Sequence, residues 1–509
     1  MNDPFYLTTP IYYPNDVPHI GHAYTTVAAD VVTRYHRLRG EDVMFLTGTD
    51  EHGLKLQRAA EAAGKAPKTW VDEMEPRWRE VWERLEISYD DYIRTTEERH
   101  KRAVQRLLEA VHDNGRDDIY LGTYEGLYCV SCELYYTEDQ LVDGNCPIHG
   151  RPVEQMAEEN YFFRLSAYQD RLLEHYGSRP EAVEPDIRRN EVMSLIRGGL
   201  QDFSISRTSF DWGIPLPWDP KHVTYVWFDA LTNYITAAGY GSDEERFARY
   251  WPAVHLIGKD ILRQHAVYWP AMLMAAGVEP PKLVFAHGYL LVGGEKMSKT
   301  KLTGIHPFEL IDHFGVDAYR YYFVREVQFG QDGSFSWESM LARYNADLAN
   351  GLGNLASRVL AMIGSYFDGA VPKAAVAPAG RLAAAAAALA ERFDAAILSF
   401  DLTAAAAALD EFVREANKYL VEVAPWKLAG QEGREVELAA ALFEAAEALR
   451  VIAVFASPIM PAAASRLWEQ LGIPEPLSDQ RLPEASRWGL IAPGTKTNRG
   501  ESLFPRLDA

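Results

Sequence analysis

The first fifty residues alternate between strand-like and helix-like apolar patterns, and this alternation restricts the possible folds most strongly. Residues 5–9 form a short apolar run, and residues 19–38 carry apolar side chains at helical spacing before Gly40, which is a typical stop signal. Residues 43–46 are typical of a second buried strand. A strand, a helix and a strand at this spacing predict a right-handed crossover within a parallel sheet.

The same pattern returns later in the chain. Residues 254–257 run into Gly258-Lys259-Asp260, and residues 283–286 run into His287-Gly288. Parallel sheets bind ligands beyond the carboxyl ends of their strands, which is where His19, His22 and Asp50 would lie. We therefore predict an α/β nucleotide-binding domain that is split into two halves by an insertion.

From about residue 329 onward, helical spacing continues almost without interruption. Two alanine-rich runs, at residues 383–388 and 404–408, could be low-complexity segments. Their flanking leucine and phenylalanine residues keep helical spacing, so we expect tightly packed helices instead of disorder.

Charge and hydropathy exclude several classes of protein. A net charge of −21 disfavours a protein that coats DNA or RNA nonspecifically, although it allows a locally basic face for one specific RNA. The N-terminal residues lack the basic and apolar regions of a signal peptide. The apolar stretch at 451–464 is interrupted by Pro458 and Pro461 and is too short to span a bilayer. We expect a cytoplasmic protein that does not enter a membrane.

All three cysteines of the chain fall within one short window. Cys129-x2-Cys132 is followed, after thirteen intervening residues, by Cys146-x2-His149. Two chelating pairs at this spacing suit a tetrahedral zinc knuckle with three thiolates and one imidazole. Because four protein ligands leave no open position on the metal, we expect one structural Zn²⁺ per chain and no disulfide framework.

Two short basic segments suggest the chemistry. His19 and His22 stand three residues apart where a helix begins, so they offer an anion both donors and a helix N-terminus. Lys296 and Lys299 stand three apart after Gly293-Gly294. Neither segment is a phosphate loop of the GxxxxGK[ST] kind. Together they resemble the paired HIGH and KMSKS signatures of class I aminoacyl-tRNA synthetases.

Further segments make this resemblance more specific, because they resemble the methionyl-tRNA synthetases in order along most of the chain. They are residues 10–15, 227–230 with Tyr234, 258–261 with His265, 354–358 and 424–426. Two positions depart from the family pattern. Pro10 replaces a common alanine at the rim of the methionine pocket, and Thr300 replaces the last serine of the KMSKS segment while keeping its hydroxyl.

The resemblance implies a class I synthetase fold: a Rossmann-type parallel sheet split by a zinc-knuckle insertion and followed by an all-α anticodon-binding bundle. The implied boundaries are 1–118 and 218–325 for the two halves of the catalytic domain and 119–217 for the insertion. A stem-contact linker would occupy 326–350, and the anticodon-binding domain 351–509.

The resemblance also implies an activity and its partners. The enzyme would ligate L-methionine to initiator and elongator tRNA(Met) through a methionyl-adenylate, using ATP with Mg²⁺ and releasing AMP and pyrophosphate. It would act as a monomer. Attack by the methionine carboxylate on the α-phosphate needs positioned cations and donors and no protein nucleophile.

Site residues carry over from the family motifs position by position. The implied catalytic residues are His19, His22, Lys296 and Lys299. The implied ATP-binding residues are His19, His22, Gly258, Asp260, His287, Gly288, Lys296, Met297, Ser298, Lys299 and Thr300. The implied methionine-binding residues are Pro10, Ile11, Tyr13, Asp50, Trp227, Ala230, Leu231, Tyr234, Ile261 and His265. The implied anticodon-binding residues are Asn354, Arg358, Pro425 and Trp426.

Three other classes of protein deserve comparison. A small nucleotidyltransferase shares an HxGH segment but lacks the helical C-terminal third and the cysteine window. A catalytically silent tRNA-binding paralogue would not need both imidazoles and both lysines. A synthetase for another amino acid, such as cysteine, uses zinc in its substrate pocket. Methionine-dependent exchange of pyrophosphate into ATP separates these alternatives.

Overall fold

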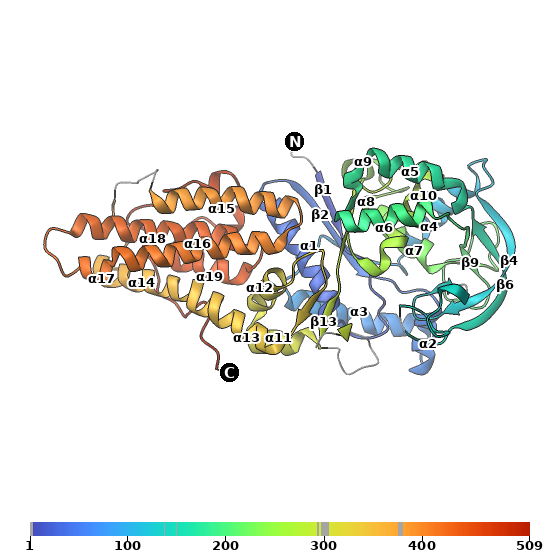
Figure 1. Ribbon diagram of the computed structural model, residues 1–509, viewed down its shortest axis with the longest axis horizontal. Coiled ribbons are helices and arrows are strands. Elements are labelled where there is room, and N and C mark those ends of the chain that lie inside the picture. Colours follow the sequence, from blue (N-terminus) through green and yellow to red (C-terminus); the bar gives the residue numbers. More distant parts are fainter. Residues whose placement is uncertain are drawn as a thin grey trace.

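A computed structural model describes residues 4–136, 138–148, 150–292, 295–296, 305–374 and 380–508. The molecule is elongated, with an α/β part at one end and a bundle of long helices at the other (Figure 1). In the described ranges, no helix combines the length and the apolar character needed to cross a membrane.

A six-stranded parallel sheet forms the centre of the α/β part, as the crossover pattern predicted. Its order is β3-β2-β1-β11-β12-β7, so the two halves of the sheet meet where β1 pairs with β11. The strands are β1 (Pro4–Thr8), β2 (Asp42–Thr49), β3 (Asp91–Arg94), β7 (Val183–Glu184), β11 (Val254–Gly258) and β12 (Leu283–His287).

The first crossover helix, α1 (Ile20–Leu38), is buried along most of its length between the sheet and the helical part. His19 lies one position before this helix and acts as its N-cap. The helix ends next to Gly40, whose φ of 76° requires the left-handed region that glycine adopts without strain.

The insertion is built on a long antiparallel hairpin. β4 (Ile119–Cys129) pairs with β6 (Glu154–Phe163), and β5 (Leu134–Tyr136) and β8 (Phe203–Ser204) extend the sheet on either side. Helices α5 (Gln169–Ser178) and α6 (Asp186–Arg197) follow this hairpin. β7 lies between these two helices in the sequence. Its residues fall within the predicted insertion, but they pair with β12 at the edge of the central sheet.

The remaining elements of the α/β part surround the sheet. The helices are α2 (Leu54–Ala62), α3 (Pro67–Arg84), α4 (Glu98–His112), α7 (Val226–Leu231), α8 (Asn233–Ala238), α9 (Glu244–Tyr250) and α10 (Trp269–Ala275). The short strands are β9 (Ser206–Arg207), β10 (Val223–Thr224), β13 (Leu290–Val292), β14 (Glu295–Lys296) and β15 (Gly333–Phe335). β15 interrupts the region that helical spacing alone suggested.

Most of the helical part follows β15. It comprises α11 (Pro307–Phe314) and α12 (Val316–Glu326), which precede that strand, and then α13 (Trp337–Arg343), a π-helical segment (Tyr344–Gly353), α14 (Asn354–Phe367), α15 (Arg381–Leu398), α16 (Leu402–Val423), α17 (Pro425–Leu428), α18 (Glu435–Ala456) and α19 (Pro461–Leu471). The prediction of packed helices at the alanine-rich runs is confirmed, because these runs lie within α15 and α16.

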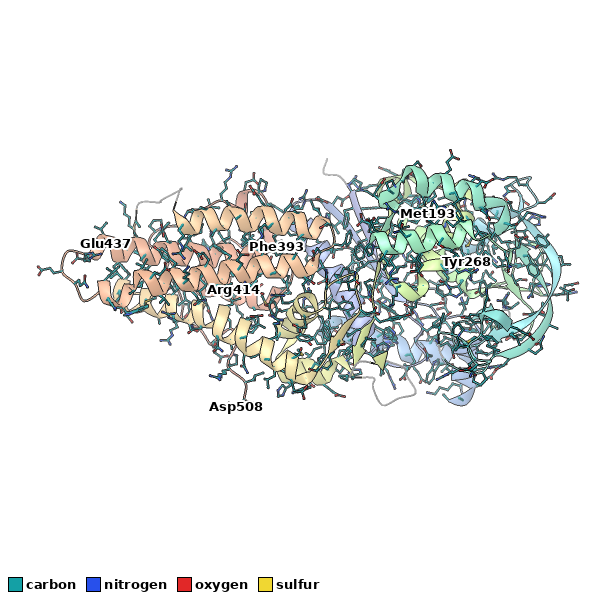
Figure 2. All side chains as sticks on the ribbon, in the orientation of Figure 1. Met193, Tyr268, Phe393, Arg414, Glu437 and Asp508 are labelled. Atoms are coloured by element: carbon teal, nitrogen blue, oxygen red, sulfur yellow. The ribbon has the colours of Figure 1, made fainter. Side chains whose placement is uncertain are left out.

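Two buried contacts join the helical part to helix α1 of the α/β part. Phe393 of α15, labelled in Figure 2, lies with its ring 5.3 Å from that of Tyr35 on α1 and 5.3 Å from that of Phe455 on α18. Arg320 of α12 is fully buried, and its guanidinium donates to Asp30 of α1 at 2.6 Å. The same group donates to the carbonyl oxygens of Leu85, Pro458 and Ile459, at 2.9–3.0 Å.

Candidate active site

A cavity of about 720 Å³ opens at the carboxyl ends of β1, β2, β11 and β12. Its lining contains every predicted methionine-binding residue: Pro10, Ile11, Tyr13, Asp50, Trp227, Ala230, Leu231, Tyr234, Ile261 and His265. It also contains the predicted ATP-binding residues His19, His22, Gly258, Asp260, His287 and Gly288. Segments that are far apart in the sequence thus form one continuous surface.

The predicted ATP-binding residues of the lysine-bearing segment cannot be placed in this lining. Met297, Ser298, Lys299 and Thr300 lie outside the described residues, and Lys296 is described only as part of the backbone of β14. Their predicted roles remain predictions.

His19 and His22 are oriented by the start of α1. The Nδ1 atom of His19 accepts from the backbone N–H of Gly21 at 3.1 Å, and Nδ1 of His22 accepts from the backbone N–H of His19 at 3.2 Å. Their rings stack with centroids 3.8 Å apart. Because Nδ1 is the acceptor in each neutral ring, Nε2 carries the proton and is the donor. Two imidazole donors therefore sit at a helix N-terminus, which suits an anionic ligand.

Asp50 follows β2 directly and is only 4 % exposed. Its Oδ1 atom has no hydrogen-bond partner among the residues that the structure describes. Burial, and after it the charges of Asp229 and Glu133, raise the pKa of Asp50 well above its usual range. A buried carboxylate of this kind is stabilised by a cation, so the position fits the ammonium group of an amino acid.

Residues without a predicted role support the wall of the cavity next to Asp50. The carboxylate of Asp229 on α7 accepts from His52 Nδ1 and from His100 Nε2, both at 2.7 Å. Burial acts to raise the pKa of Asp229, but these two imidazoles outweigh it and hold the pKa below its ordinary value. The cluster fixes α7, and with it Trp227 and Ala230, against the loop after β2.

The apolar end of the cavity contains a neutral imidazole. The Tyr234 hydroxyl donates to Nε2 of His265 at 2.7 Å, and Nδ1 of His265 faces the Ile261 carbonyl at 2.9 Å. Burial lowers the pKa of His265 to about 4. An uncharged ring beside Trp227, Ala230 and Leu231 suits an apolar thioether better than a charged side chain would.

The lowered pKa of His265 predicts a dependence of stability on pH. Above the ordinary pKa of 6.5, the ring is neutral in both the folded and the unfolded chain. As the pH falls from 6.5 towards 4, the unfolded chain binds the proton first, so the free energy of unfolding decreases. Between pH 7 and 5 the parent protein should lose about 2 kcal/mol more than His265→Gln, as measured by urea unfolding. Equal losses in both proteins would mean that His265 titrates normally.

At the opposite end of the cavity, His287 is held by the Thr25 hydroxyl, 2.8 Å from Nε2, and by its contact with the Gly288 carbonyl at 2.7 Å. A Cβ atom at Gly288 would lie 2.3 Å from the backbone of Gln331, so only glycine fits there. A Cβ atom at Gly258 would lie 2.7 Å from a carboxylate oxygen of Asp260. These positions leave the Asp260 carboxylate at the cavity, where it can accept hydrogen bonds from a ribose.

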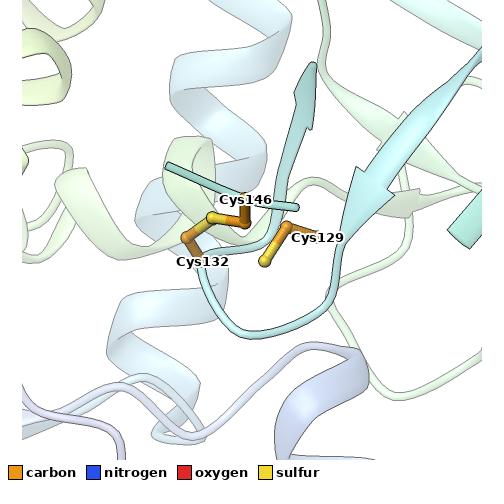
Figure 3. Close-up of side chains that lie close together, drawn as sticks. All are labelled: Cys129, Cys132 and Cys146. Atoms are coloured by element: carbon orange, nitrogen blue, oxygen red, sulfur yellow. The ribbon is translucent and has the colours of Figure 1, made fainter. Parts of the chain in front are cut away.

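The three cysteines gather at the end of β4, with their sulfur atoms turned toward one another (Figure 3). All three Sγ atoms lie within 4.8 Å of one another, and those of Cys132 and Cys146 are 3.7 Å apart. Two thiolates on one tetrahedral zinc ion, each at a Zn–S distance of about 2.3 Å, stand roughly 3.8 Å apart. The cluster therefore fits a metal. His149, the fourth predicted ligand, lies outside the described residues.

The cysteine turn also borders the cavity. Ser131 and Cys132 belong to its lining. The indole N–H of Trp227 donates to the Cys132 carbonyl at 3.4 Å, and the Tyr225 hydroxyl donates to the Glu133 carbonyl at 2.7 Å. One turn of the insertion thus supports the helix that carries Trp227, Ala230 and Leu231, three of the predicted methionine-binding residues.

The predicted anticodon residues lie together on the bundle. Asn354 is exposed at the start of α14, and Arg358 follows one turn later. The Arg358 guanidinium lies 5.2 Å from the ring centroid of Trp426, which is 41 % exposed. Pro425 is buried and begins α17, so it directs Trp426 outward. An exposed aromatic ring next to an arginine suits the stacking of an unpaired base.

Comparisons with known proteins agree with this arrangement. The family model "tRNA synthetases class I (M)" matches residues 5–155 and 148–360, and "Anticodon-binding domain of tRNA ligase" matches residues 382–502. A methionine–tRNA ligase of Streptomyces coelicolor is 51% identical and covers 99% of this chain and 97% of its own. One of Caldanaerobacter subterraneus is 50% identical and covers 100% of this chain and 80% of its own.

Solved structures give the same result. A Mycobacterium tuberculosis methionyl-tRNA synthetase in complex with methionyl-adenylate superposes with a TM-score of 0.94 at 45% identity, covering 99% of this chain and 100% of that one. The apo form of the Mycobacterium tuberculosis enzyme gives a TM-score of 0.88 at 42% identity, covering 100% and 99%. The chain therefore belongs to the methionine–tRNA ligases, within the class I tRNA synthetases.

Proposed function

We propose that this chain ligates L-methionine to tRNA(Met) in two steps, through a methionyl-adenylate, with release of pyrophosphate and then AMP. The observation that carries the proposal is the continuous cavity lining. It joins an amino-acid pocket around Asp50 and Trp227 to the imidazole pair at the start of α1. An amino-acid carboxylate and a nucleotide phosphate can therefore meet in one cavity. The product would serve both initiation and elongation.

In the first step the methionine carboxylate attacks the α-phosphate of ATP, so the protein must position two anions and stabilise the added charge. His19 and His22 donate to the phosphates from Nε2, and Asp260 accepts from the ribose hydroxyls. Lys296 and Lys299, with Met297, Ser298 and Thr300 between and beside them, bring cations to the triphosphate. Mg²⁺ accompanies ATP and neutralises part of its charge.

The methionine pocket acts through two kinds of contact. Asp50 binds the ammonium group. Pro10, Ile11, Tyr13, Trp227, Ala230, Leu231, Tyr234, Ile261 and His265 surround the side chain. Because an apolar pocket distinguishes one missing methylene by only about 1–3 kcal/mol, homocysteine is expected to compete.

The direct test is methionine-dependent exchange of labelled pyrophosphate into ATP in the absence of tRNA, followed by charging of tRNA(Met). We expect both reactions with methionine, and exchange with no other protein amino acid at comparable kcat/KM. A silent paralogue would give no exchange, and a synthetase of another specificity would respond to a different amino acid.

We further propose that the cysteine cluster holds one structural zinc ion, with His149 completing the ligand set of Cys129, Cys132 and Cys146. Purified protein should contain about one zinc per chain. Chelation should increase hydrogen exchange at residues 129–151 while the central sheet keeps its protection, because the ligands tie this loop together. Protein without zinc, or exchange unchanged by chelation, would contradict the assignment.

Anticodon recognition gives a separate prediction. Trp426→Ala should raise the KM for tRNA(Met) in charging by about 10- to 100-fold, because base–aromatic stacking contributes about 1–3 kcal/mol. Asn354 and Arg358 would contribute hydrogen bonds to base edges. Pyrophosphate exchange needs no tRNA and serves as the internal control. Loss of exchange in this variant would indicate misfolding instead.

The organisation of the chain follows from the same proposal. Residues 1–118 and 218–325 would form the catalytic halves, 119–217 the insertion, 326–350 the stem-contact linker and 351–509 the anticodon-binding domain. We propose that the enzyme acts as a monomer. A tRNA-charging enzyme works where translation occurs, so we propose a cytoplasmic location.

A further inference from the structure

Lys55, near the start of α2, places an ammonium group in the cavity. Its side chain belongs to the cavity lining. Among the described residues, no carboxylate lies within ion-pair distance of its ammonium group, whose described contact is with the face of the Tyr13 ring, 4.4 Å from the centroid. Burial lowers the pKa of Lys55, although Glu133 and Asp50 act in the opposite direction. The cavity thus holds an ammonium group that faces an aromatic ring and has no ion-pair partner among the described residues.

The nearby acidic residue Glu133 is engaged elsewhere. The N-cap of α2 is Gly53, which has a φ of 99° and no side chain with which to cap the helix. Oε1 of Glu133 takes over this role by accepting from the backbone N–H of Lys55 at 2.8 Å, and Oε2 accepts from the Tyr128 hydroxyl. Glu133 therefore fixes the backbone of Lys55 without neutralising its ammonium group.

Lys55 and Asp50 both lie near the side chain of Tyr13. The Lys55 ammonium faces the ring of Tyr13, and the Tyr13 hydroxyl acts to lower the pKa of Asp50. Asp50 in turn keeps one oxygen without a partner among the described residues. The cavity thus presents a carboxyl group and an ammonium group close to Tyr13, and neither has an ion-pair partner among the described residues. A free amino acid carries the opposite charges, an ammonium and a carboxylate, on a single carbon.

We propose that Lys55 binds the carboxylate of methionine, while Asp50 binds its ammonium, so that the two residues together recognise the zwitterion. This inference rests on the proposed function, because it assumes that methionine is the ligand of this cavity. It assigns Lys55 to the positioning of the attacking carboxylate. It also gives a reason for a lysine at this partly buried position, where a neutral side chain would have a smaller desolvation cost.

The test compares two ligands that differ in the carboxylate. L-Methionine and L-methioninol, in which a hydroxymethyl group replaces the carboxylate, are titrated calorimetrically against the parent, Lys55→Met and Lys55→Arg. Lys55→Met should weaken methionine binding by about 10- to 100-fold, because hydrogen bonds to charged groups contribute about 1.5–3 kcal/mol. Methioninol binding should change less than about threefold. Lys55→Arg should restore most of the methionine affinity.

Arg58→Met is the matched control, because Arg58 lies one turn further along α2 and pairs on the surface with Glu154. It should leave both affinities unchanged. Equal weakening of both ligands by Lys55→Met would overturn the proposal and indicate a change in pocket shape. Unchanged methionine binding with a higher KM for tRNA would also overturn it, and would assign the cation to the RNA. If the parent protein binds neither ligand, the proposed function itself fails.

Discussion

Replacement of His22 with alanine should lower methionine-dependent pyrophosphate exchange by about two to three orders of magnitude. Removal of one preorganised donor to a developing charge typically costs this much in kcat. The Nδ1 atom of His22 already accepts from the backbone of His19, so Nε2 carries the N–H of this ring. The methionine Kd should stay within about threefold of the parent value, because the pocket around Asp50 is unchanged.

Two outcomes would separate catalysis from folding in this variant. His22 also completes the capping contacts of α1, and loss of a cap costs about 1 kcal/mol of stability. His36→Ala is the matched control, because it removes an imidazole from the last turn of the same helix, where His36 pairs with Glu41. His36→Ala should lower stability and keep the exchange rate. If His22→Ala and His36→Ala reduce exchange equally, His22 has no special role with phosphate.

Arg320→Met should lower the free energy of unfolding by about 3–5 kcal/mol, the usual cost of removing one partner from a buried ion pair. Asp30 would lose a buried cation and keep Arg34 together with the hydrogen bonds from Ser88. Burial acts to raise the pKa of Asp30, and Arg320 and then Arg34 hold it below its ordinary value. The carbonyl oxygens of Leu85, Pro458 and Ile459 would lose a donor as well.

The measurement is equilibrium unfolding in urea, followed both by circular dichroism and by tryptophan fluorescence. Arg392→Met is the control, because Arg392 pairs with Glu411 on the surface of the bundle, and such pairs contribute about 0–1 kcal/mol. Because Arg320 joins α1 to the connection between α18 and α19, we expect the sheet and the bundle to unfold separately in this variant. A stability equal to that of the control would show that Arg320 does not hold the two parts together.

Much of this architecture could be predicted from the sequence, because the patterns that indicate it are local. The crossover around α1, the gathering of the three cysteines and the helical packing of the alanine runs each depend on spacing within a few dozen residues, and the structure confirms these three features. The gathering of the predicted pocket residues in one cavity was expected from the family resemblance. Their individual roles still await the experiments above.

Other features depend on pairing that spacing cannot reveal. Asp229 meets His52 and His100 across 177 and 129 positions of the chain, and no periodicity links them. Val183–Glu184 is too short to carry a strand signal, and it joins the sheet only because β12 offers an open edge. Lys55 carries no signal in the sequence, and its position in the cavity facing the Tyr13 ring is visible only in three dimensions.

The turn at Cys132 and Glu133 has a consequence for engineering. Its two carbonyl groups hold the indole of Trp227 and the phenol of Tyr225, while the Glu133 side chain caps the helix that begins beside Gly53. The insertion therefore cannot be exchanged without affecting the wall of the cavity. A chimaera that exchanged it for the corresponding segment of a relative would displace the Trp227 wall of the cavity unless these three contacts were preserved.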